Sequence, residues 1–390
     1  MKILTVGASP YLLVRNGKMH ADIIEALVKE GHEVTSAVWH HDEGYFMPAE
    51  GGVHLYEKNG KTICNLHPFM ARTEEASPFV YELMRKVKPE IILTVGDYKD
   101  TNFVFAIKAM YPTLFKWIAI YTFDCLGINP SAKDAFEYVD YVISTSNTGW
   151  NELSLFANVE GEFYPYGPDH QIFKQDTAIE NRNISFLCSA RNSQSSNLPA
   201  FMDAASRIVL NSRIHTNLYD AGDYNLDYLK EKYQANCIEL PQQYCSIKDG
   251  LSNNEMCKLY NESKFIVDCS LKSATSLSLL EAMATGCIPI GTKYGRMGEI
   301  ISMMPERFRY FVSYNTFVGQ NEEQFAIIST EDLYLVLMKV SELSEEDLQK
   351  ASKSAIEIAK NFSNTAFIDN LKQVIKNVSF AGQTLALDSI

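Results

Sequence analysis

The segment SLKSATSLSLLEAMATGCIP, residues 270–289, decides how the second half of the chain folds. An apolar run precedes it, a loop of small polar residues leads to Ser276, and a helix is expected over Leu277–Thr285. Gly286 is placed to end that helix, and Ile288–Ile290 begins the next strand. This order of strand, loop, helix and strand is typical of an α/β unit with parallel strands.

The start of this predicted helix has the properties of an anion site. The first N–H groups of a helix lack intrahelical partners and lie at the positive end of its dipole, which suits a diphosphate. Glu281 lies one turn into the helix, within reach of a ribose beside that diphosphate. The alternative interpretation is an ordinary strand–loop–helix crossover with a serine as N-cap.

Similar units recur along the whole chain. Helices are expected between the strands, for example over Gly17–Lys29 and Asn197–Leu210. The expected strands are Lys2–Val6, Glu33–Trp39, Ile91–Val95, Trp117–Tyr121 and Tyr141–Ser144, then Ile184–Ser189, Ile214–Tyr219, Phe265–Asp268 and Ile288–Ile290. We therefore predict two doubly wound parallel sheets in tandem with a cleft between them, which bind ligands beyond the carboxyl ends of their strands.

Length and composition fit two such domains. The 390 residues exceed one ordinary core, and the polar segment 165–183 marks a boundary. We predict domains at residues 1–174 and 175–362, followed by a helix and tail at 363–390. The formal charge of −13 argues against a broad basic footprint for nucleic acid.

Cysteine usage and hydropathy indicate the compartment. The eight cysteines are scattered singly, so free thiols in a reducing environment are expected. Met1–Gly7 is interpreted as a first strand rather than a signal peptide, and the sequence shows no transmembrane segment. We expect a cytoplasmic protein. The run 40–43, His-His-Asp-Glu, is interpreted as a polar loop rather than a metal site, and no metal is expected.

The segment with Glu281-Ala-Met-Ala, Gly286, Pro289 and a Gly-containing loop to Glu299 resembles the donor-site signature of the retaining GT-B glycosyltransferases that use nucleotide sugars. Weaker similarities lie in order along nearly the whole chain, at Asn16-Gly17, residues 31–34, residues 167–173 and residues 189–192. The resemblance implies two Rossmann-like domains facing across a cleft, with the last helix crossing back to pack on the first domain.

The resemblance also implies roles for individual donor-site residues. Glu281 would bind the ribose hydroxyls, and Arg191 would contact the charge of the diphosphate. Gly17 would let a loop of the first domain approach the donor phosphate, although a C-cap or turn glycine is an alternative. Glu299 would lie at the end of the following loop as a donor-site residue. Alternatively, it would only be an acidic residue at the start of a helix, where the helix dipole favours negative charge. The amides of Thr275, Ser276 and Leu277 would face the diphosphate.

Two positions depart from the resembled pattern. Ser273 stands where the family has a Glu that contacts the transferred sugar, and Ser196 or Asn197 stands where it has a Lys that supports the leaving phosphate. Losing such a charged contact commonly costs about 3 kcal/mol of transition-state stabilisation. Our hypothesis is that Lys272 or Arg296 partly replaces the Lys, because both flank the phosphate-binding loop.

Candidate residues of the acceptor side lie in the first half of the chain. Asp97 and Asp124 each follow a predicted strand, where a carboxylate can orient or deprotonate an acceptor hydroxyl. Loop capping is the alternative role for both. Phe123 stands where the family often has a His, and His20 either faces the donor or is a surface or packed imidazole.

The predicted function is transfer of a hexosyl or pentosyl group from a nucleotide-diphosphate sugar, UDP- or GDP-linked, to an acceptor hydroxyl, with retention of configuration. The acceptor class stays open among glycan, lipid, small molecule, protein and modified DNA. A catalytically weak or inactive sugar-nucleotide-binding homologue is one alternative. A glycosyltransferase acting on a modified DNA base is another, and a salt-dependent affinity for duplex DNA would favour it.

Overall fold

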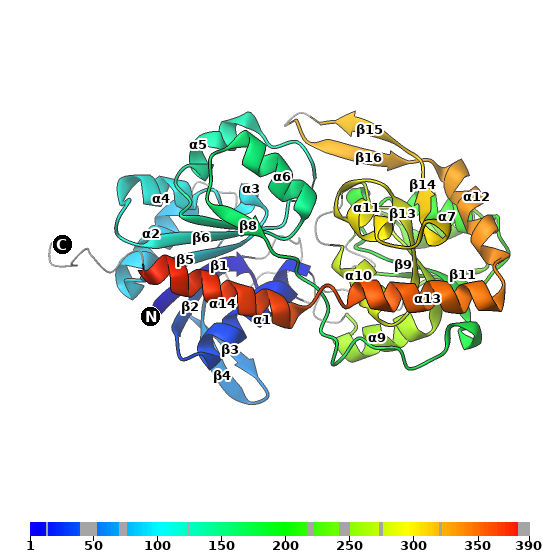
Figure 1. The fold of residues 1–390 in the computed structure, drawn as a ribbon, viewed down its shortest axis with the longest axis horizontal. Helices are drawn as coiled ribbons and strands as arrows, with labels where there is room; N and C mark the ends of the chain where they lie inside the picture. The colour runs from blue at the N-terminus through cyan, green and yellow to red at the C-terminus, as the bar shows by residue number, and fades with distance from the viewer. Residues whose placement is uncertain are drawn as a thin grey trace. The chain divides into compact units, whose positions relative to one another are not determined.

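The computed structural model describes residues 1–12, 15–39, 53–69, 76–123, 125–216, 222–241, 250–272, 276–319 and 322–380. The chain forms two compact units (Figure 1). Unit 1 comprises Met1–Phe123, Ile128–Pro165 and Asn364–Ile390, and unit 2 comprises Asp124–Gly127 and Tyr166–Ser363. The units therefore divide after Pro165, whereas the sequence suggested a division after residue 174. Residues 166–174 pack on unit 2, where Cys257 Sγ donates to the carbonyl of Ile172 at 3.1 Å.

Unit 1 is built on one sheet in the order β3-β4-β2-β1-β5-β6-β7-β8. Its strands are β1 (Lys2–Ala8), β2 (Glu33–Trp39), β3 (His54–Lys58), β4 (Lys61–Pro68), β5 (Ile91–Gly96), β6 (Lys116–Tyr121), β7 (Tyr141–Ser144) and β8 (Gly161–Phe163). All neighbouring strands pair in parallel except β3 and β4. These two form a hairpin, whose turn residues Asn59 and Gly60 both have positive φ, as a type I′ turn requires.

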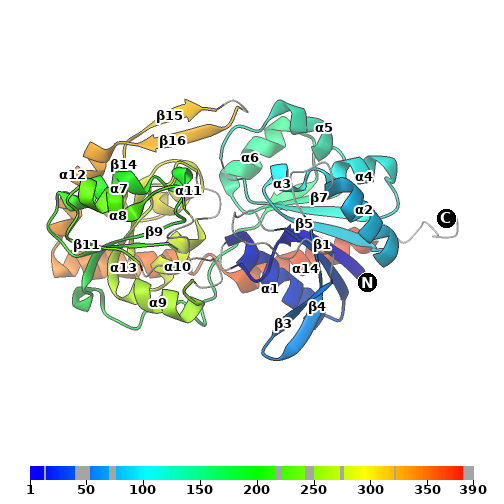
Figure 2. The ribbon, with the colours of Figure 1, turned by 180° about the vertical axis from the view of Figure 1, so that it is seen from behind.

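Helices cover both faces of this sheet (Figure 1 and Figure 2). They are α1 (Arg15–Lys29), α2 (Ala76–Val87), α3 (Tyr98–Thr101), α4 (Val104–Met110), α5 (Lys133–Phe136), α6 (Asn147–Phe156) and α14 (Asn364–Phe380). Because both faces are covered, the central strand β5 is buried along its whole length, as expected for a parallel sheet.

Unit 2 repeats this architecture around a sheet in the order β11-β10-β9-β12-β13-β14. Its strands are β9 (Ile184–Ser189), β10 (Ser212–His215), β11 (Ile238–Glu239), β12 (Ser263–Val267), β13 (Ile288–Thr292) and β14 (Tyr310–Val312). A separate antiparallel hairpin joins β15 (Tyr314–Val318) to β16 (Gln324–Ile328). The helices are α7 (Leu198–Ser206), α8 (Leu226–Lys232), α9 (Asn253–Asn261), α10 (Leu277–Ala284), α11 (Gly295–Ser302), α12 (Thr330–Ser341) and α13 (Glu345–Ala359). The six paired strands are all parallel, so the predicted doubly wound α/β class is confirmed.

The buried guanidinium of Arg182 ties the ends of α9 and α10 together. Arg182 is 4% exposed and donates to the carbonyl oxygens of Thr177, Tyr260, Ser263 and Thr285. Tyr260 lies near the end of α9, and Thr285 is the C-cap of α10. The cation therefore satisfies helix-terminal carbonyls where the helix dipoles are negative.

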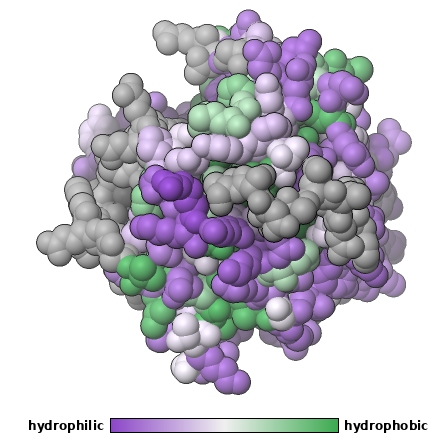
Figure 3. Space-filling view, turned by 90° about the vertical axis from the view of Figure 1, so that its left-hand side faces the viewer, coloured by the Kyte–Doolittle hydropathy of each residue, from purple (hydrophilic) through white to green (hydrophobic). Residues whose placement is uncertain are grey.

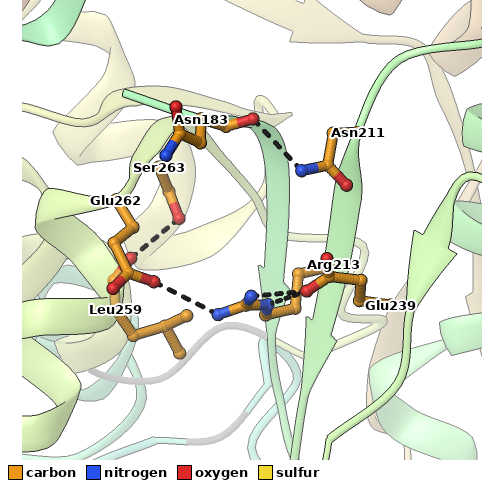
Figure 4. A network of polar contacts seen from close by, with 7 residues as sticks. All are labelled: Asn183, Asn211, Arg213, Glu239, Leu259, Glu262 and Ser263. Carbon is orange, nitrogen blue, oxygen red and sulfur yellow. Dashed lines mark hydrogen bonds and ion pairs between the residues drawn. The ribbon is translucent and has the colours of Figure 1, made fainter. Parts of the chain in front are cut away.

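A second polar network lies at the amino-terminal edge of the same sheet (Figure 4). Arg213 on β10 donates to Glu239 at 2.8 Å and to Glu262 at 3.3 Å. The Asn211 amide donates to the carbonyl of Asn183 at 3.3 Å. Ligands of wound sheets bind at the opposite, carboxyl edge, so we interpret this network as structural.

No helix within the described ranges combines the length and the apolar composition needed to cross a bilayer. The face in Figure 3 is largely hydrophilic, with small hydrophobic patches scattered over it. Single exposed apolar residues of this kind are normal on folded proteins.

Candidate functional site

The carboxyl edge of the unit 2 sheet gathers most of the predicted donor-site residues. Strands β9, β12 and β13 are parallel, so the loops that follow them all lie at this edge. Arg191 follows β9, Lys272 follows β12, and Arg296 and Glu299 lie in α11 after β13. Helix α10 also begins here, and it positions Glu281.

The start of α10 has the geometry of an anion-binding helix terminus. Ser276 is its N-cap, with φ of 47°, and its carbonyl accepts from Leu280 N at 3.1 Å. The N–H groups of Leu277 to Leu279 precede this first intrahelical bond, which is the position of the donors in an anion-binding helix start. Ser273 and Thr275 lie outside the described residues, and their predicted contacts stay predictions.

Glu281 is held inside unit 2 by a tyrosine that sequence reasoning missed. Its side chain is 4% exposed, and Tyr260 on α9 donates a hydrogen bond to its Oε2 at 3.4 Å. Burial, together with the negative charge of Glu281, raises the pKa of Tyr260 well above its ordinary value, so the hydroxyl stays a donor. The two residues are far apart in sequence, and no local pattern relates them.

The loop after β9 is fixed by Asn192 and exposes Arg191. The Asn192 backbone N–H donates to Thr216 Oγ1 at 2.9 Å, and its side-chain amide donates to Tyr224 O at 2.8 Å. Gly222 permits this packing, because a Cβ there would lie 2.2 Å from Asn192. The neighbouring Arg191 side chain is exposed at the carboxyl edge, as an anion ligand needs to be.

The position of the family's Lys carries neutral side chains. Ser196 is 6% exposed, and its hydroxyl lies 3.1 Å from that of Ser193. Asn197 adopts a left-handed conformation with φ of 50° at the start of α7. Neither side chain carries a charge, and the equivalence of this position to the Lys of the resembled family stays a prediction.

The two proposed replacement cations have different surroundings. Lys272 is partly exposed, with Nζ 3.3 Å from Glu323 Oε2. Arg296 is only 2% exposed, and its Nη1 lies 2.6 Å from Glu299 Oε2. The Arg296 guanidinium also lies 4.8 Å above the ring of Phe362. Arg296 and Glu299 thus form a pair inside unit 2, and Lys272 is the more accessible cation of the two.

His20 occupies the core of unit 1. Its ring is 0% exposed, with Nδ1 2.7 Å from the carbonyl of Ala8 and Nε2 2.9 Å from Thr5 Oγ1. The carbonyl requires a proton on Nδ1, so Nε2 accepts from a hydroxyl in the neutral ring. Burial lowers the pKa of His20 to about 4. Of the two interpretations, the packed imidazole describes this ring, because both nitrogens are engaged within the unit.

Gly17 lies within α1 rather than in a loop. A Cβ at this position would lie 2.4 Å from the carbonyl oxygen of Leu12 and 2.8 Å from that of Ser9. The glycine therefore lets the segment after β1 pack directly on the first turn of α1. Gly17 is therefore not a turn or C-cap residue, as one interpretation of the sequence had it. The close contact with Leu12 and Ser9 is sufficient to explain why this position is glycine.

The acceptor-side candidates are only partly described. Asp97 follows β5, is 2% exposed, and caps α3 by accepting from Lys99 N at 3.0 Å. This is the loop-capping role that the sequence left open. Asp124 and residues 40–43 lie outside the described residues.

Comparisons with known proteins identify the fold. Sucrose-phosphate synthase from Thermosynechococcus elongatus aligns with a TM-score of 0.77 and 14% identity, over 98% of this chain and 100% of that chain. The catalytic domain of starch synthase IV from Arabidopsis thaliana, bound to ADP and acarbose, gives 0.62 and 12%, over 97% and 99%. The pneumococcal O-GlcNAc transferase GtfA, in complex with UDP and GlcNAc, gives 0.65 and 10%, over 97% and 99%.

These similarities lie in structure and not in sequence. No protein-family model matches the chain, and no curated protein sequence matches it. The structural neighbours are GT-B glycosyltransferases and align over nearly the whole length of both chains. The chain therefore has the GT-B fold of two Rossmann-like domains, as the sequence resemblance predicted.

Proposed function

We propose that the protein is a glycosyltransferase that takes a sugar from a nucleotide-diphosphate sugar and transfers it to an acceptor hydroxyl with retention of configuration. The observation that carries this proposal is helix α10 at the carboxyl edge of the unit 2 sheet. Its first N–H groups precede the first intrahelical hydrogen bond and would donate to a diphosphate, and Glu281 follows one turn later, held by Tyr260.

The structural neighbours support the same chemistry. Starch synthase IV is bound to ADP, and GtfA is in complex with UDP, so nucleoside diphosphates occupy proteins of this fold. We propose a UDP- or GDP-linked hexose or pentose as the donor. The seven described cysteines are all free thiols and six of them are buried, which favours the reducing cytoplasm as its location.

The proposed division of labour follows from charge and geometry. The diphosphate leaves with negative charge that develops in the transition state, where preorganised donors stabilise it most. The start of α10 and Arg191 supply such donors, with Lys272 as a further cation, and we propose that no metal is required. Glu281 accepts hydrogen bonds from the ribose hydroxyls. Asp124 remains the proposed acceptor-side carboxylate.

Binding and turnover of donors test the proposal. We expect UDP- or GDP-sugars to raise the melting temperature, because a ligand at a hundredfold excess over Kd stabilises the folded state by about 2.7 kcal/mol. Slow donor hydrolysis without acceptor should accompany binding. Glu281→Ala should abolish both, since each hydrogen bond to a charged group contributes about 1.5–3 kcal/mol.

A matched control and two outcomes make the test decisive. Glu357→Gln, which changes an exposed carboxylate on α13, should behave as wild type. Stabilisation without any turnover, even with acceptor panels, would favour the non-catalytic sugar-nucleotide-binding homologue, for which the neutral Ser196 is the specific observation. No response to any nucleotide would refute the proposal.

A further inference from the structure

The hairpin of β15 and β16 brings a buried carboxylate to Lys272, in the segment that follows β12. Glu323, the residue before β16, is 8% exposed. Its Oε2 lies 3.3 Å from Nζ of Lys272. The two residues are 51 positions apart, so the hairpin alone accounts for their meeting.

Main-chain hydrogen bonds fix the hairpin beside the residue that precedes Lys272. Ala326 N donates to the carbonyl of Leu271 at 2.9 Å, and Leu271 N donates to the carbonyl of Ser195 at 2.7 Å. The segment before Lys272 is thereby held between the hairpin and the loop after β9. The Lys272 ammonium also lies 4.9 Å above the ring of Phe325.

The turn that carries Glu323 is equally constrained. Gly319 N donates to the carbonyl of Glu323 at 2.7 Å, and Gln324 N donates to the carbonyl of Leu126 at 2.8 Å. Gly127 must be glycine for this packing, because a Cβ there would lie 2.0 Å from the carbonyl oxygen of Glu322. The backbone on both sides of Glu323 is therefore preorganised.

Stability alone is a poor reason for a carboxylate at this place. Burying the Glu323 carboxylate carries a desolvation penalty, and its attraction to an ammonium that is partly exposed is screened by water and need not exceed that penalty. A bound diphosphate would compete for the Lys272 ammonium. The Glu323 carboxylate, which is only an acceptor, would then face neutral hydroxyl donors.

We propose that Glu323 is a specificity-determining residue of the donor site, where its carboxylate accepts hydrogen bonds from hydroxyls of the transferred sugar. The inference rests on the proposed function. It deepens that function, because the sequence has the short neutral Ser273 directly after Lys272 and the hairpin brings a carboxylate from elsewhere to Lys272.

The test separates the sugar from the nucleotide. Calorimetry would measure Kd for UDP, GDP and ADP and for their glucose and N-acetylglucosamine conjugates. The readout is the affinity that the sugar adds, as the ratio of the two Kd values for one nucleotide. Glu323→Gln should reduce this ratio about tenfold, because one hydrogen bond to a charged acceptor is lost. The nucleotide alone should bind to Glu323→Gln as tightly as to wild type, or more tightly.

The adjacent exposed residue provides the control. Glu322→Gln, in the same turn, should leave both Kd values unchanged. If Glu323→Gln does not fold, the double variant Lys272→Met with Glu323→Gln removes both charges, and the ratio is measured on it with the same expectation.

Each remaining outcome overturns the inference in a recognisable way. A Glu323→Gln ratio equal to that of wild type, or a common change in both Kd values, would mean that Glu323 acts only through Lys272. A wild-type ratio of one would mean that no sugar hydroxyl is bound. If wild type binds no nucleotide at all, the proposed function fails and the inference with it.

Discussion

Lys272 and Arg296 are both cations near the candidate phosphate site, but burial assigns them different tasks. The Arg296 side chain is 2% exposed and paired with Glu299, whereas that of Lys272 is 32% exposed and paired with Glu323. A buried pair that loses one partner leaves an uncompensated charge, which is strongly destabilising. A partly exposed lysine can exchange its carboxylate for a phosphate at little structural cost.

The two alanine variants should therefore fail differently. Lys272→Ala should slow donor hydrolysis about 10²-fold, the loss expected for one charged contact to the leaving group. Arg296→Ala should lower the free energy of unfolding by about 3–5 kcal/mol. Single-turnover kinetics and urea unfolding measure the two effects, with Lys258→Ala on the exposed side of α9 as control. Unchanged turnover in both variants would eliminate them as replacements for the family's Lys.

At the scale of elements, the imidazole of His20 on α1 makes hydrogen bonds to the sheet of unit 1. His20 links the helix to β1 through Ala8 and Thr5, and Ser36 on β2 lies 3.5 Å from Nε2. Burial lowers its pKa from 6.5 to about 4. Between these two pH values the imidazole is therefore neutral in the folded chain and protonated in the unfolded chain. The stabilisation is complete above pH 6.5, is lost progressively as the pH falls from there, and the loss levels off below about pH 4.

This linkage predicts a pH dependence carried by a single residue. Between pH 7.5 and 4.5, wild type should lose about 2.5 kcal/mol more unfolding free energy than His20→Gln, which lacks the titrating group. Urea unfolding at a series of pH values measures the difference. Equal losses in both proteins would show that the buried ring does not resist protonation.

At the scale of the whole molecule, the two ends of the chain complete the same unit. Helix α14 packs on α1, where Asn364 donates to Asp22 at 3.0 Å and Lys372 pairs with Glu30 at 2.9 Å (Figure 2). Phe367, Leu371 and Ile375 of this helix are at most 2% exposed. Each such side chain contributes about 1.5–3 kcal/mol on burial, so the helix carries a large part of an ordinary folding free energy.

A chain ending at Ser363 should consequently lose the folded state of unit 1. We expect its cooperative thermal transition to fall or disappear, and limited proteolysis to cut first within residues 1–165, while unit 2 persists. A chain ending at residue 380 is the matched control and should melt as the full chain does. An unchanged transition in the shorter chain would contradict this assignment of α14.

Local patterns in the sequence were sufficient wherever neighbouring residues decide the structure. The hairpin at Asn59-Gly60 and the capping box of Ser252 and Glu255 are structures of this kind, because each depends on residues within one turn. The wound architecture and the placement of Glu281 on α10 follow for the same reason, from the alternation and spacing of apolar runs.

Only the tertiary structure decided which distant residues meet. Tyr260 reaches Glu281 and Glu323 reaches Lys272 because helices and a hairpin remote in sequence pack side by side. Burial likewise turned His20 from a candidate ligand into a core residue, and a backbone contact with Leu12 explained Gly17. Exposure and partners depend on long-range packing, which spacing along the chain does not encode, whereas secondary structure depends on the local period of apolar residues.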